Sequence, residues 1–254
     1  MAHVLILGGT AEARYLAGRL ADRADLTVTL SLAGRTAAPL PQPVPVRIGG
    51  FGGAVGLVDY LVSGRIDALI DATHPYASRM SANAVAAARW TGVPLVTLKR
   101  PPWVAVEGDR WTEVGDVRAA LASLGPLPVS VFVTLGRSEL APLVEVPQHH
   151  YLIRSVDPVE PPLSLPHASY VTARGPFAEA DDRALMTAHR IAVVIAKNSG
   201  GTATYGKIAA ARALGIPVIL LRRPPIADAP VVDTMQGALA WLDHALTSAA
   251  ARGV

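Results

Sequence analysis

The stretch that decides the fold of this chain is His3-Val4-Leu5-Ile6-Leu7-Gly8-Gly9-Thr10-Ala11-Glu12-Ala13-Arg14. An apolar run at 4–7 stops at two glycines, and a helix-forming segment begins directly afterwards. This is the order of a buried parallel strand, a phosphate-binding turn and a helix N-terminus. Glycine lets the backbone approach a pyrophosphate closely, and the first helical turn offers free N–H groups. The stretch predicts a nucleotide-binding turn formed by Gly8, Gly9, Thr10, Ala11 and Arg14.

The spacing of this turn departs from the dinucleotide fingerprint G-x-G-x-x-G. Counting from Gly8, the third place is Thr10 and the sixth is Ala13. Alanine is tolerated at the sixth place, but Thr10 is not a glycine. A strand-to-helix turn that needs glycine only for its backbone geometry fits the same residues, so both interpretations stay open.

Composition bounds the class of protein. The 254 residues suffice for one large domain or two small ones. The chain has no cysteine, which excludes disulfides, thiolate metal sites and a cysteine nucleophile. No apolar run reaches the ~18–20 residues of a membrane span, and the N-terminus enters a strand pattern instead of a signal peptide. We therefore expect a cytoplasmic enzyme without a membrane segment.

The charge pattern bears on the partner. The net charge is only +3, aromatic residues make up 5%, and the arginines are scattered at strand ends. Nucleic-acid binders usually carry a basic stripe with interleaved aromatics, so no nucleic-acid partner is expected. Scattered arginines at loop positions fit a small polyanionic ligand better. The sequence leaves a monomer and a small homo-oligomer equally open.

Apolar strand-like runs alternate with alanine-rich helical runs through nearly the whole chain. This alternation predicts an α/β fold with parallel sheets covered on both faces, which hold ligands beyond the carboxyl ends of the strands. The expected strands are 4–7, 26–30, 46–48, 68–70, 95–98, 129–134, 151–155, 170–173, 192–196 and 218–221. The expected helices are 12–21, 55–63, 78–91, 181–188 and 204–214.

An internal repeat divides the chain. The segment Gly92-Val93-Pro94-Leu95-Val96-Thr97-Leu98-Lys99-Arg100-Pro101-Pro102 reappears as Gly215-Ile216-Pro217-Val218-Ile219-Leu220-Leu221-Arg222-Arg223-Pro224-Pro225. We predict two similar domains, 1–125 and 126–254, divided near the prolines at 126 and 128, which oppose helix and central strand alike. Similar halves can also exchange equivalent strands, here those near 95–98 and 218–221.

The end of the second strand bears on the cofactor. NAD enzymes place a carboxylate there for the ribose 2′-hydroxyl, whereas NADP enzymes use an arginine for the 2′-phosphate. No carboxylate stands between 30 and 35, but Ser31 and Arg35 offer a hydroxyl and a guanidinium. These two residues favour NADPH over NADH. An ordinary turn with a solvated arginine is the alternative.

A polar cluster, Asp71-Ala72-Thr73-His74-Pro75-Tyr76, follows the strand at 68–70. Its position over the ligand crevice is where a nicotinamide would lie, so Thr73, His74 and Pro75 are predicted to bind the cofactor. Pro75 holds His74 extended. No second histidine or carboxylate stands at ligand spacing, so no metal is expected. His74 and Tyr76 could equally be packing groups at the head of a helix.

Three strand ends in the second half, 133–138, 172–177 and 196–202, each join a cation to glycine. Such turns expose backbone donors beside a positive side chain, as a carboxylate or phosphate receptor requires. The predicted ligand-binding residues are Thr134, Arg137, Arg174, Lys197, Asn198, Ser199, Gly200 and Gly201. Elsewhere, Glu145, His149 and His150 are expected at the surface, and Trp103 and Trp111 in packing or between domains.

Together these segments resemble the precorrin-6A reductase family of cobalamin biosynthesis. The matching pieces span almost the whole chain, and they are residues 6–12, 31–35, 47–53, 71–75, 100–103, 136–138, 174–176 and 197–201. The departures are mild: Ala13 where relatives often carry Gly, Tyr76 where Phe is common, and Leu135 inside what is often Thr-Thr-Gly-Arg.

The resemblance implies an NADPH-dependent reductase that converts precorrin-6A into precorrin-6B by reducing one double bond of the macrocycle. It also implies two Rossmann-like domains with the ligands between them. The cofactor would use the first half and the carboxylate-bearing tetrapyrrole the second. A proton must also be delivered, and His74, Tyr76, Lys197 and water are the candidates.

Two alternatives stay open at this point. One is a nucleotide-sensing or ligand-binding α/β protein without chemistry. The other is a reductase of another small substrate, such as a short-chain sugar or ketone reductase. The Tyr-x-x-x-Lys pair of that class is absent, because Tyr205 is followed four places later by Ala209.

Overall fold

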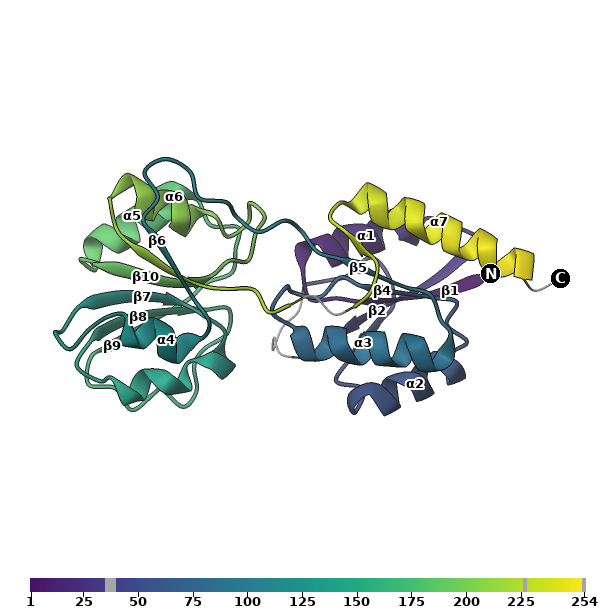
Figure 1. Cartoon of the computed structure of the whole chain (residues 1–254), viewed down its shortest axis with the longest axis horizontal. Coiled ribbons are helices and arrows are strands. Elements are labelled where there is room, and N and C mark those ends of the chain that lie inside the picture. The colour runs from purple at the N-terminus through teal and green to yellow at the C-terminus, as the bar shows by residue number, and fades with distance from the viewer. Residues whose placement is uncertain (35–39, 226–227, 253–254) are drawn as a thin grey trace. The chain divides into compact units, whose positions relative to one another are not determined.

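The computed structural model contains two six-stranded sheets, and every strand pairing in both is parallel (Figure 1). The structure describes residues 1–34, 40–225 and 228–252. Helices cover the sheets, so the prediction of two Rossmann-like α/β halves is confirmed. Within the described residues, no helix is long and apolar enough to cross a membrane.

The first sheet has the order β12-β5-β4-β1-β2-β3. Its strands are β1 (Ala2–Leu7), β2 (Leu26–Leu32), β3 (Val46–Ile48), β4 (Ala68–Asp71), β5 (Leu95–Leu98) and β12 (Val231–Val232), and its helices are α1 (Ala11–Ala21), α2 (Gly53–Ser63), α3 (Ser78–Thr91) and α7 (Met235–Arg252). Successive residues of β1 point to opposite faces. Helices α1 and α7 cover one face of this sheet, and α2 and α3 cover the other (Figure 1). Val4 and Ile6 pack with α1 and α7, whereas Leu5 and Leu7 pack with α2 and α3.

The second sheet has the order β6-β11-β10-β7-β8-β9. Its strands are β6 (Trp111–Val114), β7 (Ser130–Thr134), β8 (His150–Ser155), β9 (Ala168–Thr172), β10 (Val193–Lys197) and β11 (Val218–Leu221). Its helices are α4 (Val117–Ala122), α5 (Glu179–Ala188) and α6 (Gly206–Ala213), with 3₁₀ turns η1 (Arg137–Glu139) and η2 (Ala141–Glu145). Trp103 and Trp111 pack against the core between this sheet and the helices α5 and α6, as their packing role predicted.

The sixth strand of each sheet follows, along the chain, the fifth strand of the other sheet. After β5 the chain continues into β6, which pairs with β11, and after β11 it continues into β12, which pairs with β5. Both sheets therefore show the doubly wound order 3-2-1-4-5-6. The helix after each exchanged strand follows it: α4 contacts β6 and β11, and α7 contacts β4 and β5.

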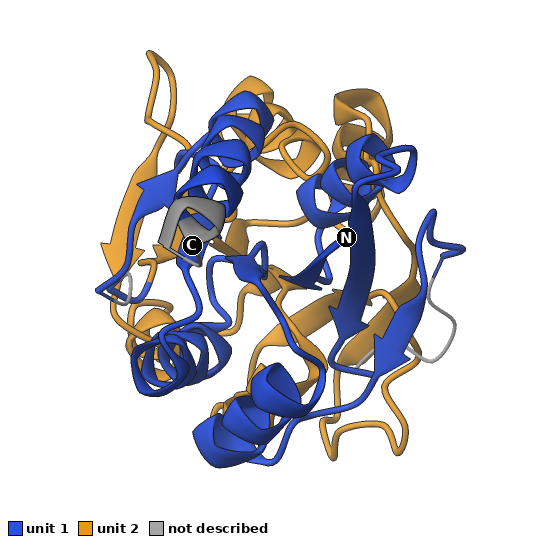
Figure 2. Ribbon diagram, turned by 90° about the vertical axis from the view of Figure 1, so that its right-hand side faces the viewer, with its two compact units in different colours: residues 1–101, 224–254 blue, residues 102–223 orange. Residues whose placement is uncertain are grey.

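The exchange sets the division of the chain. One compact unit spans residues 1–101 and 224–254, and the other spans 102–223 (Figure 2). This differs from the predicted division at residue 125, because the prolines at 126 and 128 lie in the loop between α4 and β7, within the second unit. The strands at 95–98 and 218–221 stay in their own sheets, and the strand after each is exchanged.

One surface expectation was wrong. His149 is fully buried before β8, and neither ring nitrogen has a hydrogen-bond partner in the described part of the chain. Burial, with a smaller contribution from the neighbouring His150, lowers the pKa of His149. His150 is exposed and stacks on His167 at 4.5 Å between ring centroids. Glu145 is exposed as expected and pairs with Arg118.

The exchanged helix α7 generates a prediction about where stability is lost. Leu242 is fully buried in the core of the first unit, although it lies far along the chain from β4 and β5. We expect Leu242→Ala to lower the free energy of unfolding by about 2–5 kcal/mol. The rate of amide hydrogen exchange should increase most in β4 and β5. An increase concentrated in β7 and β10 instead would contradict the packing of α7 against β4 and β5.

Candidate active site

The turn after β1 separates the roles of its two glycines. A Cβ on Gly8 would lie 2.6 Å from Cδ1 of Leu30, and the Gly8 N–H donates to the Ser31 carbonyl at 2.9 Å. Gly8 therefore serves close packing between β1 and β2. Gly9 has φ +111°, and a Cβ there would meet nothing within 4 Å. Its exposed backbone leaves room for a ligand to approach.

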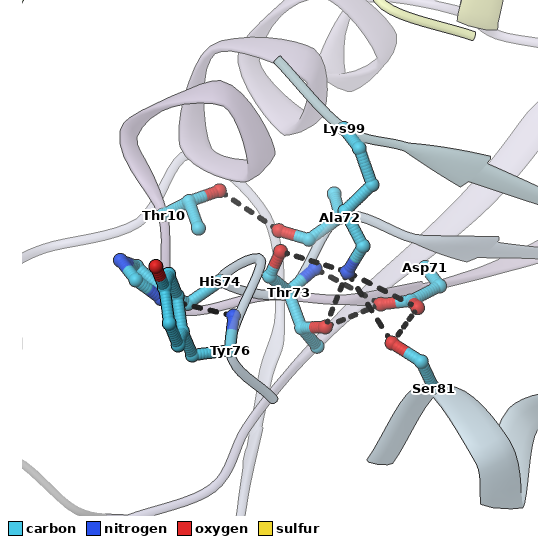
Figure 3. A network of polar contacts seen from close by, with 8 residues as sticks. All are labelled: Thr10, Asp71, Ala72, Thr73, His74, Tyr76, Ser81 and Lys99. Atoms are coloured by element: carbon cyan, nitrogen blue, oxygen red, sulfur yellow. Dashed lines mark hydrogen bonds and ion pairs between the residues drawn. The ribbon is translucent and has the colours of Figure 1, made fainter. Parts of the chain in front are cut away.

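Thr10, which stands where the fingerprint has glycine, caps helix α1. Its hydroxyl accepts from the Ala13 N–H at 3.1 Å and donates to the Ala72 carbonyl at 2.8 Å (Figure 3). An N-cap satisfies one of the free donors of the first turn. The second bond fixes the glycine turn to the loop that follows β4.

A buried polar network lies beneath that loop (Figure 3). Asp71, at the end of β4, is fully buried and accepts from the Thr73 hydroxyl at 2.6 Å and from the Ser81 hydroxyl at 2.5 Å. The Lys99 ammonium lies 3.5 Å from the Asp71 carboxylate and donates to the carbonyl and hydroxyl oxygens of Thr73, each at 3.2 Å. A buried carboxylate needs such partners, since an unpaired charge there is costly.

Lys99 and Ser81 belong to this buried network, and sequence reasoning missed both. Lys99 belongs to the basic pair of the internal repeat, which by itself indicates no role. Ser81 lies in α3, ten residues beyond Asp71. The available signal was Asp71 itself: a carboxylate at the end of a buried strand needs polar partners.

A small hollow opens over the carboxyl ends of β1, β4 and β5. Its lining residues are Thr10, Glu12, Thr73, Pro75, Leu98, Lys99 and Arg100. Arg100 donates to the Glu12 carboxylate at 2.6 Å, which joins the end of β5 to the first turn of α1. The structure thus brings the predicted residues Thr10, Thr73 and Pro75 to one edge.

His74 and Tyr76 lie next to each other in the loop after β4 (Figure 3). Their ring centroids are 5.7 Å apart, and His74 Nδ1 accepts from the Tyr76 N–H at 3.3 Å. A neutral imidazole that accepts at Nδ1 carries its proton on Nε2. His74 Nε2–H and the Tyr76 hydroxyl are therefore the groups that could transfer a proton here.

Three of the remaining predicted cofactor residues, Ser31, Ala11 and Arg14, belong to β2 and α1. Ser31 lies in β2 and is buried. Ala11 begins α1, and Arg14 is exposed on that helix. Arg35 lies outside the described residues.

In the second unit, the predicted residues Thr134 and Lys197 end the adjacent strands β7 and β10. The Thr134 hydroxyl donates to the Ile195 carbonyl at 3.3 Å. The Lys197 ammonium forms an ion pair with Glu139, whose carboxylate also accepts from the Gly136 N–H at 3.1 Å. Glu139 is another contact that sequence reasoning missed, and it fixes where the ammonium lies.

The loop after β10 is held by contacts to the protein itself. The Asn198 amide donates to the Trp103 carbonyl at 2.9 Å and accepts from the Trp103 N–H at 2.7 Å. The predicted donor Asn198 thus holds the backbone of Trp103. Gly200 and Gly201 have φ of +68° and +70°, which glycine adopts without strain.

Two arginines complete this edge. Arg137 is half-exposed, donates to the Pro158 carbonyl at 3.3 Å, and lies 3.8 Å from the Asp157 carboxylate. Arg174 is exposed in the loop after β9. The second unit therefore presents several cations at the carboxyl ends of its strands, as an anionic ligand requires.

Comparisons with known proteins agree over almost the full length. A family model described as precorrin-6x reductase CbiJ/CobK matches residues 3–243. A precorrin-6A reductase of Sinorhizobium sp is 54% identical over 97% of this chain and 94% of its own length. One from Rhodobacter capsulatus is 50% identical over 97% and 98%. A solved structure of CobK precorrin-6A reductase superposes with a TM-score of 0.92 at 50% identity, covering 96% and 97%.

The glycine turn generates a test of binding against folding. Valine at Gly9 would carry a branched side chain into the open space above the turn and would strain a positive φ. We expect Gly9→Val to weaken nicotinamide dinucleotide binding by tenfold or more, which is about 1.4 kcal/mol or more. Isothermal titration measures the affinity, and far-UV circular dichroism should stay near wild type.

Gly92→Val is the matched control for this variant. Gly92 also has a positive φ and open space at its Cβ, but it caps the C-terminal end of α3. The Gly92→Val variant should lose about as much stability as Gly9→Val and keep its affinity for the nicotinamide dinucleotide. Equal loss of affinity in both variants would assign Gly9 a purely structural role.

Proposed function

The chain belongs to the precorrin-6x reductase family, and from this premise we propose that it transfers a hydride from NADPH to precorrin-6A, giving precorrin-6B. It is an oxidoreductase of cobalamin biosynthesis that reduces precorrin-6A with a nicotinamide cofactor. The observation that carries this is the identity of 50–54% over nearly the full length of precorrin-6A reductases.

The residues of the first unit fit a dinucleotide. The open space above Gly9 would receive a pyrophosphate, and the first turn of α1 offers N–H donors to it. Thr10 and Thr73 line the adjacent hollow with hydroxyl groups. Gly8, Ala11 and Arg14 complete the proposed binding turn.

NADPH is the proposed form of the cofactor. The end of β2 lacks the carboxylate that holds a ribose 2′-hydroxyl, and Ser31 and Arg35 supply the donors that a 2′-phosphate needs. NADPH supplies the hydride when bound, and this chemistry belongs to the cofactor. The protein's part is to orient the two reactants and to exclude water.

The loop after β4 is proposed to orient the nicotinamide. Thr73 is held by Asp71 and Lys99, and Pro75 lines the hollow beside it. A reduced carbon–carbon double bond also needs a proton at the neighbouring carbon. His74 Nε2, the Tyr76 hydroxyl and the Lys197 ammonium are the proposed donors, with water as the competitor.

The second unit is proposed to bind the tetrapyrrole, whose rim carries acetate and propionate carboxylates. Arg137, Arg174 and Lys197 supply cations at the carboxyl ends of its strands. Charge-assisted hydrogen bonds from such cations are stronger than neutral ones. Other residues complete the proposed site. They are the hydroxyl-bearing Thr134 and Ser199, then Asn198, and the backbone of Gly200 and Gly201.

The cofactor proposal is tested by Arg35→Ala. The assay follows oxidation of the reduced cofactor, which should require precorrin-6A. The variant should raise the Michaelis constant for NADPH by about 10–100-fold, because a hydrogen bond to a charged group contributes about 1.5–3 kcal/mol. The constant for NADH should change far less. A wild-type enzyme that uses both cofactors equally well would refute the assignment.

The substrate proposal is tested by Lys197→Ala and Arg137→Ala. Each should weaken tetrapyrrole binding by about tenfold, and the loss should grow at low salt, where charge attraction is screened least. NADPH affinity should stay within about twofold. Arg118→Ala removes an exposed cation on α4 and serves as the control. Loss of NADPH with the tetrapyrrole retained would reverse the assignment of the two halves.

A further inference from the structure

A basic pair lies at each point where the chain passes from one sheet to the other, which we call the crossing point. Each pair is next to a loop that is proposed to bind a ligand. Each sheet's fifth strand is followed by two cations and two prolines, where the chain leaves for the other sheet. We infer that one cation of each pair, Lys99 in the first unit and Arg223 in the second, is a positioning residue for the loop after the fourth strand. The inference rests on the proposed function, because these loops are the proposed cofactor and substrate sites.

In the second unit, Arg223 holds two successive carbonyl groups. Its Nε donates to the Asn198 carbonyl at 2.8 Å, and its Nη2 donates to the Ser199 carbonyl at 2.9 Å. A planar guanidinium fork suits this two-point contact. The Asn198 side chain is held from another direction by the backbone of Trp103.

In the first unit, Lys99 holds the equivalent loop. Its buried ammonium donates to the Thr73 carbonyl and hydroxyl, each at 3.2 Å, and lies beside the Asp71 carboxylate. Asp71 ends β4 as Lys197 ends β10, so Thr73 and Ser199 stand two residues beyond corresponding strand ends. In both units, a cation from the crossing point thus binds a backbone oxygen at the same place.

These contacts set the direction of the backbone donors. The peptide unit is planar, so a fixed carbonyl also fixes the following N–H on its other side. Arg223 thereby orients the Ser199–Gly200 peptide, and Lys99 orients the Thr73–His74 peptide. Donors held in advance bind a ligand without the entropic cost of ordering the loop.

Arg223→Met tests the inference in the second unit. It should raise the dissociation constant for the tetrapyrrole by about tenfold, the loss expected for bonds to a charged group. A positioning effect should keep the same factor at about 0.05 M and about 0.5 M salt, whereas a direct ion pair would be screened. The dissociation constant for NADPH should stay within about twofold.

Arg110→Met is the matched control. Arg110 also donates to a backbone carbonyl, that of Gly215 at 2.8 Å, but at the opposite, amino end of β6 and β11. It should change neither dissociation constant more than about twofold at comparable loss of thermal stability. Equal effects of both variants would overturn the inference.

Other outcomes separate this inference from the proposed function. An Arg223→Met loss that shrinks strongly at high salt would overturn positioning, because it indicates direct contact with the substrate. A salt-independent loss of NADPH affinity instead would uphold positioning and refute the assignment of the two halves. No change in either constant would overturn the inference.

The first unit needs a paired variant, because Lys99→Met alone leaves the buried Asp71 carboxylate without its cation. In Asp71→Asn/Lys99→Met both charges are removed. We expect a fall in kcat of about tenfold or more, with the Michaelis constant for the tetrapyrrole within about twofold. An unchanged kcat and unchanged NADPH affinity in this folded variant would overturn the role of Lys99.

Discussion

The architecture depends on the two consecutive prolines that follow the fifth strand of each sheet, because they end the hydrogen-bonded ladder there. Proline has no N–H to donate, so a strand cannot continue through Pro101-Pro102 or Pro224-Pro225 with an intact ladder. The chain leaves the sheet at both places, and a strand that arrives from beyond the other sheet fills the sixth position. The first unit therefore needs a segment that is distant in sequence to complete its core, as Leu242 shows, whereas the second unit is one continuous stretch of chain.

The points where the chain leaves each sheet also supply side chains to the candidate sites. Arg100 reaches the first turn of α1 through Glu12, Lys99 reaches Asp71 and Thr73, and Arg223 reaches the loop after β10. A basic pair placed immediately before the prolines lies at the carboxyl end of its sheet, where ligands of such folds bind. The same four-residue motif, two cations followed by two prolines, therefore marks the point where the chain leaves each sheet and supplies side chains to the neighbouring loop, and it occurs twice in the sequence.

Local patterns predicted the elements whose signal lies within the element itself. The ten expected strands and five expected helices are present, with ends shifted by a few residues at most. The strands and α-helices that were missed, β6, α4, β12 and α7, are those of the exchange. Strand β6 is four residues with two polar ones, and β12 is two residues, so neither carries a clear apolar run. Their partners are set by long-range pairing, which no local pattern contains.

For the candidate site, the sequence predicts positions but not contacts. Glycine turns and strand ends single out Gly9, Thr73 and Lys197 as candidates, because such features are local in sequence. The partners Ser81 and Glu139 were missed, because they meet Asp71 and Lys197 only after the strands align. His149 was misplaced for a related reason: a histidine between a proline-rich loop and a strand can face either way, and packing decided it.

Lysine and arginine occupy different environments in this chain: the lysines are buried or half-buried, and the exposed cations are arginines. The chain has only three lysines, and each is at least partly buried against oxygen atoms: Lys99 on Thr73, Lys197 on Glu139 and Lys207 on the Thr204 carbonyl. A compact ammonium with three donors suits such oxygen cages. In the described part of the chain, exposed side-chain cations other than histidine are therefore arginines. Arginine stays charged at any physiological pH, so the positive charge of these exposed side chains is not lost by deprotonation.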